Sequence, residues 1–168
     1  MTVSCDEFKA GVALWASGVT IVTARAGERV HGMTVSAFSS VSLDPPLVLV
    51  CVDKASITLG LIREGGCFAA NVLARGQEAL SDKFASKKEE HLRFDGLETL
   101  TGKTGAPLIP GALANVDCRL VSEYDAGDHV ITIGQVEQII TREVEPLVFY
   151  RGAYHALDRS APGLDDKR

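Results

Sequence analysis

Residues 112–141 read ALANVDCRLVSEYDAGDHVITIGQVEQIIT, and this stretch decides the fold class. Apolar and polar residues alternate from Ala114 to Leu120, which is the pattern of a half-buried strand. After a turn at Gly127 and Asp128, residues 128–141 are rich in β-branched side chains, which predicts a second long strand. His129 stands at the start of this second strand. The chain is therefore expected to contain a sheet with long strands.

Working outward from this pair, further strands are expected over residues 19–25, 29–41, 47–52, 67–73 and 147–157. Residues 47–52 are continuously apolar, so that strand is expected to be buried on both faces. Short helices are expected over residues 5–16, 56–66 and 76–85. Strands outnumber helices and do not alternate with long helices, which argues against a doubly wound parallel sheet. The pattern predicts a mainly β protein, an antiparallel barrel that is closed or nearly closed, with a few peripheral helices.

Composition restricts the classes of partner and compartment. The 168 residues fit one domain, with a core over about 8–155 and a disordered tail expected over 158–168. The net charge is −5 and no basic block occurs, which argues against nucleic acid as a partner. No apolar run reaches the roughly 18 residues of a membrane helix, and the first residues do not resemble a signal peptide. We therefore expect a cytoplasmic protein that does not bind membranes.

The cysteines and histidines do not have the spacing of metal ligands. The four cysteines are scattered without a C-x-x-C pair, so free and mostly buried thiols are expected and no metal is predicted. Cys51 lies in an apolar run, where burial makes a thiol inert.

The stretch GLETLTGKT at residues 96–104 resembles a phosphate-binding P-loop. Five residues separate Gly96 from Gly102, whereas the motif has four, and Gly105 and Pro107 prevent a following helix. A nucleoside triphosphatase is therefore not expected. A Rossmann site is not supported either, because the chain contains no G-x-G-x-x-G.

Two other stretches allow both a structural and a binding interpretation. Hydroxyl and small side chains gather in MTVSAFSS, residues 33–40, where a flat ligand could approach the backbone, or where an edge strand simply exposes hydroxyls to solvent. In DKASIT, residues 53–58, a buried strand meets a helix N-terminus, which suits a phosphate. The alternative is that Ser56 only caps that helix.

Taken in order, several stretches resemble the flavin reductase-like family, the small reductase components of two-component flavin-dependent monooxygenases. They are MTVSAFSSVSLDPPLVLVCVDKAS, FAANVL, LSDKFA, GAPLIPGALANVDCRL, GDHVITIGQV and PLVFYRGAY. The resemblance covers residues 8–155 and implies a split β-barrel of the Greek-key, FMN-binding type, assembled as a homodimer. It further implies that NADH or NADPH reduces FAD or FMN, and that the reduced flavin leaves for a partner monooxygenase.

The resemblance also implies site residues. His129, in GDH, is expected beside the nicotinamide; because hydride transfer needs no strong acid or base, its role would be positioning. Residues expected along the flavin ring are Met33, Thr34, Val35, Ser36, Ala37, Ser39, Ser40, Cys51, Val52 and Asp53. Lys54, Ser56 and Thr58 would hold a phosphate, and Asn71 would help to anchor the flavin. Phe149, Tyr150 and Arg151 would close the pocket, while His91, Arg93 and Phe94, in a mobile charged loop over residues 86–96, would cover an adenine.

Two other functions share this fold. One is a flavin-binding electron carrier without a nicotinamide site, and the other is an interaction domain that binds no flavin. Turnover of NADH with free flavin separates both from a reductase.

Overall fold

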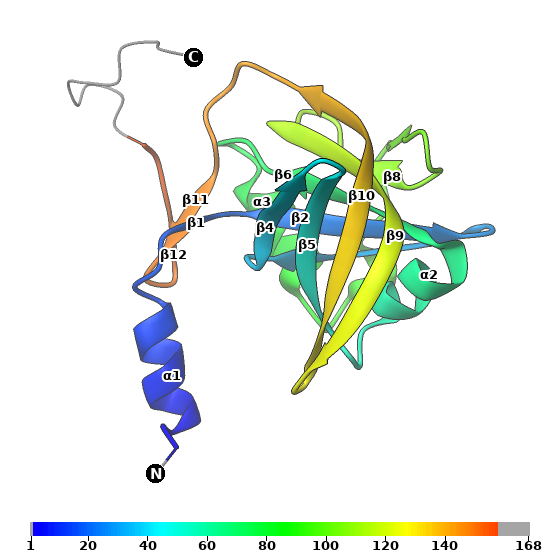
Figure 1. Ribbon diagram of the computed structural model, residues 1–168. Coiled ribbons are helices and arrows are strands. Elements are labelled where there is room, and N and C mark those ends of the chain that lie inside the picture. The colour runs from blue at the N-terminus through cyan, green and yellow to red at the C-terminus, as the bar shows by residue number, and fades with distance from the viewer. Residues whose placement is uncertain (1, 158–168) are drawn as a thin grey trace.

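The computed structural model describes residues 2–157 and is organised around a seven-stranded antiparallel sheet (Figure 1). In spatial order the strands are β3 (Arg29–Val35), β2 (Thr20–Ala26), β6 (Cys67–Val72), β9 (Ala114–Ala126), β10 (His129–Thr141), β5 (Pro46–Asp53) and β4 (Phe38–Leu43). A smaller sheet joins β1 (Ser17–Gly18), β11 (Val148–Tyr150) and β12 (Ala153–His155), and β7 (Leu100–Thr101) pairs with β8 (Pro107–Leu108). The described helices are α1 (Cys5–Val12), α2 (Ile57–Gly65), α3 (Glu78–Ala85) and the 3₁₀ turn η1 (Glu90–Leu92). The prediction of a mainly β fold with a few helices is confirmed, and the tail expected over 158–168 lies outside the described residues.

The hairpin of β9 and β10 forms the long strand pair that the sequence predicts. Ala126 pairs with His129, so Gly127 and Asp128 form a two-residue turn, and Gly127 has the positive φ of 65° that such turns require. The expected half-burial of β9 is wrong for its first half. Asn115 and Asp117 are buried as well, because residues from the segment between β7 and β9 bond to their side chains.

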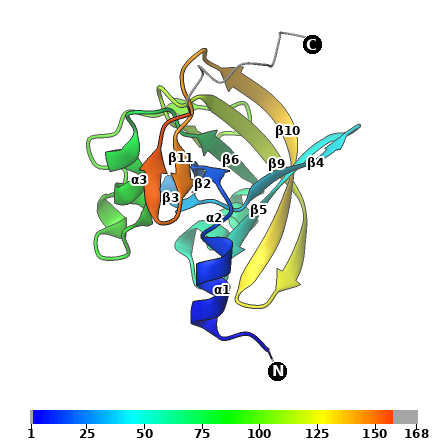
Figure 2. The ribbon, with the colours of Figure 1, turned by 90° about the vertical axis from the view of Figure 1, so that its left-hand side faces the viewer.

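The strand expected over residues 29–41 is instead two strands, β3 and β4, separated by Ser36 and Ala37. They occupy opposite ends of the sheet, since β3 pairs only with β2 and β4 only with β5. Val35 and Phe38 are three residues apart, roughly 11 Å at full extension, so the end of β3 and the start of β4 lie near each other. The first and last strands of the sheet order are therefore consecutive in the chain, and Figure 2 shows the sheet as strongly curved.

Two other strand expectations need correction. In β5 buried residues alternate with half-buried ones, so this strand is not buried on both faces as its apolar run suggests. The last expected strand is a hairpin, because Arg151 (φ 51°) and Gly152 (φ 77°) form a turn between β11 and β12. The positive φ of Arg151 is strained for a residue with a side chain.

Local signals set the helix ends. Ser4 and Glu7 form the capping box that starts α1, but the helix ends at Val12, not at residue 16, and none of its residues is buried. Figure 1 shows α1 projecting from the body of the fold. Ser56 caps α2, and Gly66 ends it with a left-handed φ of 66°. Among the helices that the structure describes, none has the length and apolar character needed to cross a membrane.

Candidate functional site

Three adjoining pockets run past the point where β3 meets β4, and we call them together the β3–β4 groove. Their volumes are 190, 420 and 550 Å³. The first two share Thr34 and Ala85, and the second and third share Ser36 and Phe149, so they adjoin one another. The three pockets therefore lie side by side along the connection between β3 and β4.

Ten residues expected in the site line this groove, although they come from four separate parts of the chain. They are Met33, Thr34, Val35, Ser36, Ala37, Ser39, Asp53, Ser56, Arg93 and Phe149. The small side chains around Ser36 follow from the local fold, since the two-residue passage between the end strands leaves Ser36 and Ala37 exposed.

One end of the groove is polar and contains ion pairs. Ser56 lines it and caps α2, its Oγ accepting from the backbone N–H of Leu59 at 3.2 Å. Lys87 lies opposite, with Nζ 3.6 Å from Asp53 Oδ2, and Glu90 is also in the lining. A helix N-terminus beside an exposed ammonium is a combination that favours a phosphate.

The other end is apolar and is formed partly by α1. Phe8, Val12 and Trp15 face Phe38, Leu49 and Phe149 across the 550 Å³ pocket. Such a surface suits the flat face of an aromatic ring system.

The middle of the groove contains residues that the sequence did not indicate. The Tyr154 hydroxyl donates to Asp82 Oδ1 at 2.7 Å and lies 2.8 Å from Ser81 Oγ, which joins the β11–β12 hairpin to α3. Burial is the main cause that raises the pKa of the Tyr154 phenol, so it remains protonated at neutral pH. Thr34 Oγ1 donates to the Ser81 carbonyl at 2.7 Å. The PLVFYRGAY and LSDKFA stretches hold these residues, but only the hairpin and the helix bring them together.

His129 lies beside the polar end, not in the lining of the three pockets. It pairs across the sheet with Asp53, and its Nδ1 is 2.7 Å from Asp128 Oδ1. The hydrogen bond from His129 is the main cause that lowers the pKa of the Asp128 carboxyl, which keeps it ionised. The backbone N–H of Lys54 donates to the Asp128 carbonyl at 3.0 Å, which fixes the turn to the end of β5.

Asn71 and Thr58, expected to touch a ligand, are fully buried with internal partners. Asn71 Nδ2 donates to the Ile21 carbonyl at 2.9 Å, and its Oδ1 accepts from the Ile109 N–H at 2.9 Å. Thr58 Oγ1 is 2.8 Å from His31 Nδ1. In this geometry both side chains support the walls of the fold, and their direct contact with a flavin stays a prediction.

The other expected residues do not line the three pockets. Lys54 pairs with Asp125 at 3.0 Å, and the Arg151 guanidinium lies 5.5 Å from the Tyr150 ring centroid. Those outside the lining of the three pockets are Ser40, Cys51, Val52, Lys54, Thr58, Asn71, His91, Phe94, His129, Tyr150 and Arg151.

The charged segment 86–96, expected to be a surface loop, is not wholly exposed or irregular. The segment contains η1, and the side chain of Arg93 is buried with its NH1 donating to the Gly32 carbonyl at 2.8 Å. Phe94 packs edge-on against Phe84, with centroids 5.2 Å apart. The remaining residues of the segment are largely exposed and charged.

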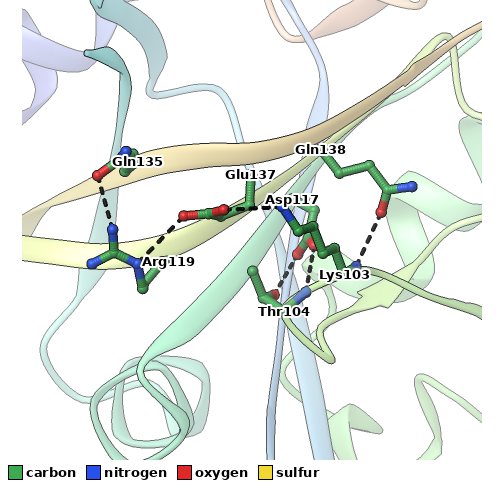
Figure 3. Close-up of polar contacts among 7 residues, drawn as sticks. All are labelled: Lys103, Thr104, Asp117, Arg119, Gln135, Glu137 and Gln138. Atoms are coloured by element: carbon green, nitrogen blue, oxygen red, sulfur yellow. Dashed lines mark hydrogen bonds and ion pairs between the residues drawn. The ribbon is translucent and has the colours of Figure 1, made fainter.

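A second polar cluster occupies the P-loop-like stretch (Figure 3). The Thr104 N–H and Oγ1 both donate to the buried Asp117 carboxylate, at 2.7 and 2.5 Å, and the Lys103 N–H donates to Gln138 Oε1 at 3.0 Å. Glu137 lies between Lys103 and Arg119, within 3.5 Å of each. These contacts attach the β7–β8 turn to β9 and β10, in agreement with the rejection of a P-loop.

Comparison with known proteins identifies the family. The model of the flavin reductase like domain matches residues 12–158, and the chain belongs to this family. An NADH-dependent flavin reductase of Rhodococcus sp is 43% identical over 86% of this chain and 81% of its own length. The reductase component of 4-hydroxyphenylacetate 3-monooxygenase from Thermus thermophilus is 40% identical over 90% of this chain and 96% of its own.

Solved structures agree with the sequence comparison. The Streptomyces globisporus NADH:FAD oxidoreductase SgcE6, solved with NAD and FAD fragments, superposes with a TM-score of 0.87 at 33% identity. The match covers 96% of this chain and 99% of that one. The family predicted from the ordered motifs is thereby confirmed.

Proposed function

We propose that this protein is an NADH-dependent flavin reductase that reduces FAD or FMN and releases the reduced flavin to a partner monooxygenase. The observation that carries the proposal is the β3–β4 groove, whose adjoining pockets are lined by nine residues of the family motifs together with Arg93. A relative named as an NADH-dependent flavin reductase supports the reaction, and a relative named as the reductase component of a monooxygenase supports the partner.

The groove fits a flavin in its chemistry. Its apolar end, at Trp15 and Phe149, suits an aromatic ring system, and the exposed backbone at Ser36 and Ala37 can meet a polar ring edge. Its polar end, at Ser56 and Lys87, suits a phosphate. The bound flavin supplies the hydride-accepting chemistry, and the protein supplies orientation.

The chain's own residues position the two cofactors. His129 is held by Asp128 at Nδ1, which directs the opposite edge of the imidazole away from the turn. There it can contact a nicotinamide that stacks on the flavin ring within the groove. Holding two rings in a reactive arrangement lowers the entropic part of the barrier, and no acid–base step at His129 is needed.

The finer features of the architecture belong to the same proposal. The sheet is a split barrel, and the two-residue connection between its end strands supports closure, as does the shared core of Val35, Val48 and Val50. The chain forms one flavin reductase domain and acts in the cytoplasm, a reducing compartment consistent with four free thiols.

A homodimer is also part of the proposal. The side chains of Phe8, Val12 and Trp15 are 61%, 52% and 77% exposed, an amount of apolar surface that a second copy would cover.

The test is oxidation of NADH in the presence of free FMN and, separately, free FAD, followed by loss of nicotinamide absorbance. Catalytic turnover with at least one flavin is expected. Binding of flavin without oxidation of NADH would instead favour an electron carrier, and no binding of either flavin would favour an interaction domain.

A further inference from the structure

Arg93 is a deeply buried charged residue in an otherwise exposed segment. Its side chain is 4% exposed, and its guanidinium donates from NH1 to the Gly32 carbonyl at 2.8 Å and from NH2 to the Ser86 carbonyl at 2.7 Å. Gly32 belongs to β3, and Ser86 directly follows α3. One side chain therefore bonds an end strand of the sheet to the start of the charged segment.

The surroundings leave little freedom for the strand end of this connection. A Cβ at Gly32 would approach the Val22 carbonyl oxygen to 2.9 Å and Phe84 Cε1 to 3.0 Å, so β3 and α3 are closely packed here. Phe94 adds an edge-on contact with Phe84. Glu90 lies 3.9 Å from Arg93 NH1, one turn earlier in the segment. Close packing thus surrounds the strand side of the connection, whereas most of residues 86–92 are exposed.

The segment that Arg93 holds is also a wall of the groove. Lys87 and Glu90 line the 190 Å³ pocket opposite Ser56. Lys87 reaches across to Asp53, which is paired with His129. A shift of this segment would alter both the polar end of the groove and the neighbourhood of His129.

We propose that Arg93 is a positioning residue: by bridging the Gly32 and Ser86 carbonyls it fixes residues 86–93 as the wall that holds bound flavin. This inference rests on the proposed function and replaces direct contact with an adenine as the main role of Arg93. The bridge requires arginine, because a planar guanidinium can donate from two separate nitrogens to two acceptors in fixed directions. A lysine ammonium has one nitrogen and cannot span both carbonyls in the same way.

The first experiment compares Arg93→Lys with Arg29→Lys. Arg29 is also on β3, but it is exposed and pairs with Glu64, outside the groove. Arg93→Lys should raise the KM for FMN, FAD or both by about tenfold or more, the effect of losing a charged hydrogen bond. The kcat should stay within about twofold of wild type, a change well below the tenfold that 1.4 kcal/mol produces. Arg29→Lys should change neither. Unchanged KM for both flavins in a folded Arg93→Lys protein would overturn the proposal.

The second experiment follows cleavage by trypsin after Lys87 and Lys88, whose side chains are exposed. Cleavage should be faster in Arg93→Lys than in wild type and unchanged in Arg29→Lys. On the wild type alone, saturating FMN or FAD should slow cleavage, which keeps the test valid if the variant does not fold. Equal cleavage rates with and without flavin, in a protein that binds flavin, would contradict the proposed wall.

The two proposals fail in different ways. If wild-type protein neither binds nor turns over FMN or FAD, the proposed function is wrong, whatever trypsin shows. If wild type turns over flavin and Arg93→Lys matches it in KM and in trypsin cleavage, only the positioning role is wrong.

Discussion

At the scale of single residues, His129 shows how a two-residue turn determines the direction of a functional side chain. Gly127 and Asp128 join two strands whose registers are fixed, so the imidazole cannot move far along the sheet. The hydrogen bond with Asp128 then limits the rotation of the ring. A histidine held this way can serve as a contact for a planar ligand.

Replacing His129 with alanine should therefore raise the KM for NADH by about tenfold, the loss of roughly one good contact, while changing flavin affinity little. His129→Gln should recover part of the effect, because an amide retains hydrogen-bonding capacity. Steady-state kinetics give the KM for NADH, and a binding titration gives the affinity for flavin. Weaker flavin binding with an unchanged KM for NADH would contradict the assigned role.

The cysteines should differ strongly in reactivity. Cys5 is exposed on α1, whereas burial and the nearby Asp117 raise the pKa of the Cys118 thiol to about 12. Because the thiolate is the reactive form, a raised pKa lowers reactivity at every pH below it. Iodoacetamide at pH 8 should alkylate Cys5 first and leave Cys118 unmodified in the native protein, as measured by mass spectrometry of peptides. Early labelling of Cys118 would contradict the described burial.

At the scale of elements, the attachment of the β7–β8 turn depends on Asp117 and much less on Lys103. Asp117 is buried and accepts two hydrogen bonds from Thr104, while the Lys103 ammonium is exposed in its pair with Glu137. A buried hydrogen bond to a charged group contributes more to the free energy of unfolding than an ion pair on the surface does.

Asp117→Ala should therefore lower the free energy of unfolding by about 2–4 kcal/mol, because it leaves the Thr104 donors without their acceptor. Lys103→Met should cost at most about 1 kcal/mol. Urea denaturation gives both values. Equal losses in the two variants would show that the turn is held in another way.

The sequence predicted the type and position of most elements, because alternation and capping residues act locally. Ser4 and Ser56 mark helix starts, and Gly66 marks a helix end, each through its own backbone geometry. The division of residues 29–41 could not be predicted in this way. Val35 and Phe38 lie in a continuous β-favouring stretch, and only the partners chosen by each half, β2 and β5, separate them.

The site was predictable where the family motifs form its lining and less so where contacts are long-range. Thr34, Ser36 and Phe149 were expected, and the fold brings them together. Tyr154 is not predictable from the sequence, because its place in the groove depends on hydrogen bonds to Ser81 and Asp82 on α3, which is distant in the chain. The burial of Arg93 is not predictable from the sequence for a similar reason. It lies in a charged segment expected to contact a ligand, and only tertiary packing buries it.

At the scale of the whole molecule, the position of α1 is not explained by packing within a single chain. It has a stable cap yet buries none of its residues, and its apolar side chains border the groove. A second copy packed on α1 would cover this surface and complete the apolar end of the site.

Trp15→Ser should raise the dissociation constant of the dimer by at least about tenfold, since exposed tryptophans are typical anchors of interfaces. Leu100→Ser, a comparable change at an exposed leucine on β7, should have little effect. Sedimentation over a range of concentrations measures both. A wild-type protein that stays monomeric at high concentration would rule out the dimer.

If the β3–β4 groove binds the flavin that NADH reduces, a large side chain placed inside it should weaken flavin binding. Ser36→Trp fills the groove where two of its pockets join, whereas Thr141→Trp adds the same side chain at the exposed far end of β10. Titration with FMN and FAD, followed by flavin fluorescence, gives the affinity of each protein. A flavin site in the groove predicts at least about tenfold weaker flavin binding for Ser36→Trp and wild-type affinity for Thr141→Trp. Wild-type affinity in a folded Ser36→Trp protein would contradict it.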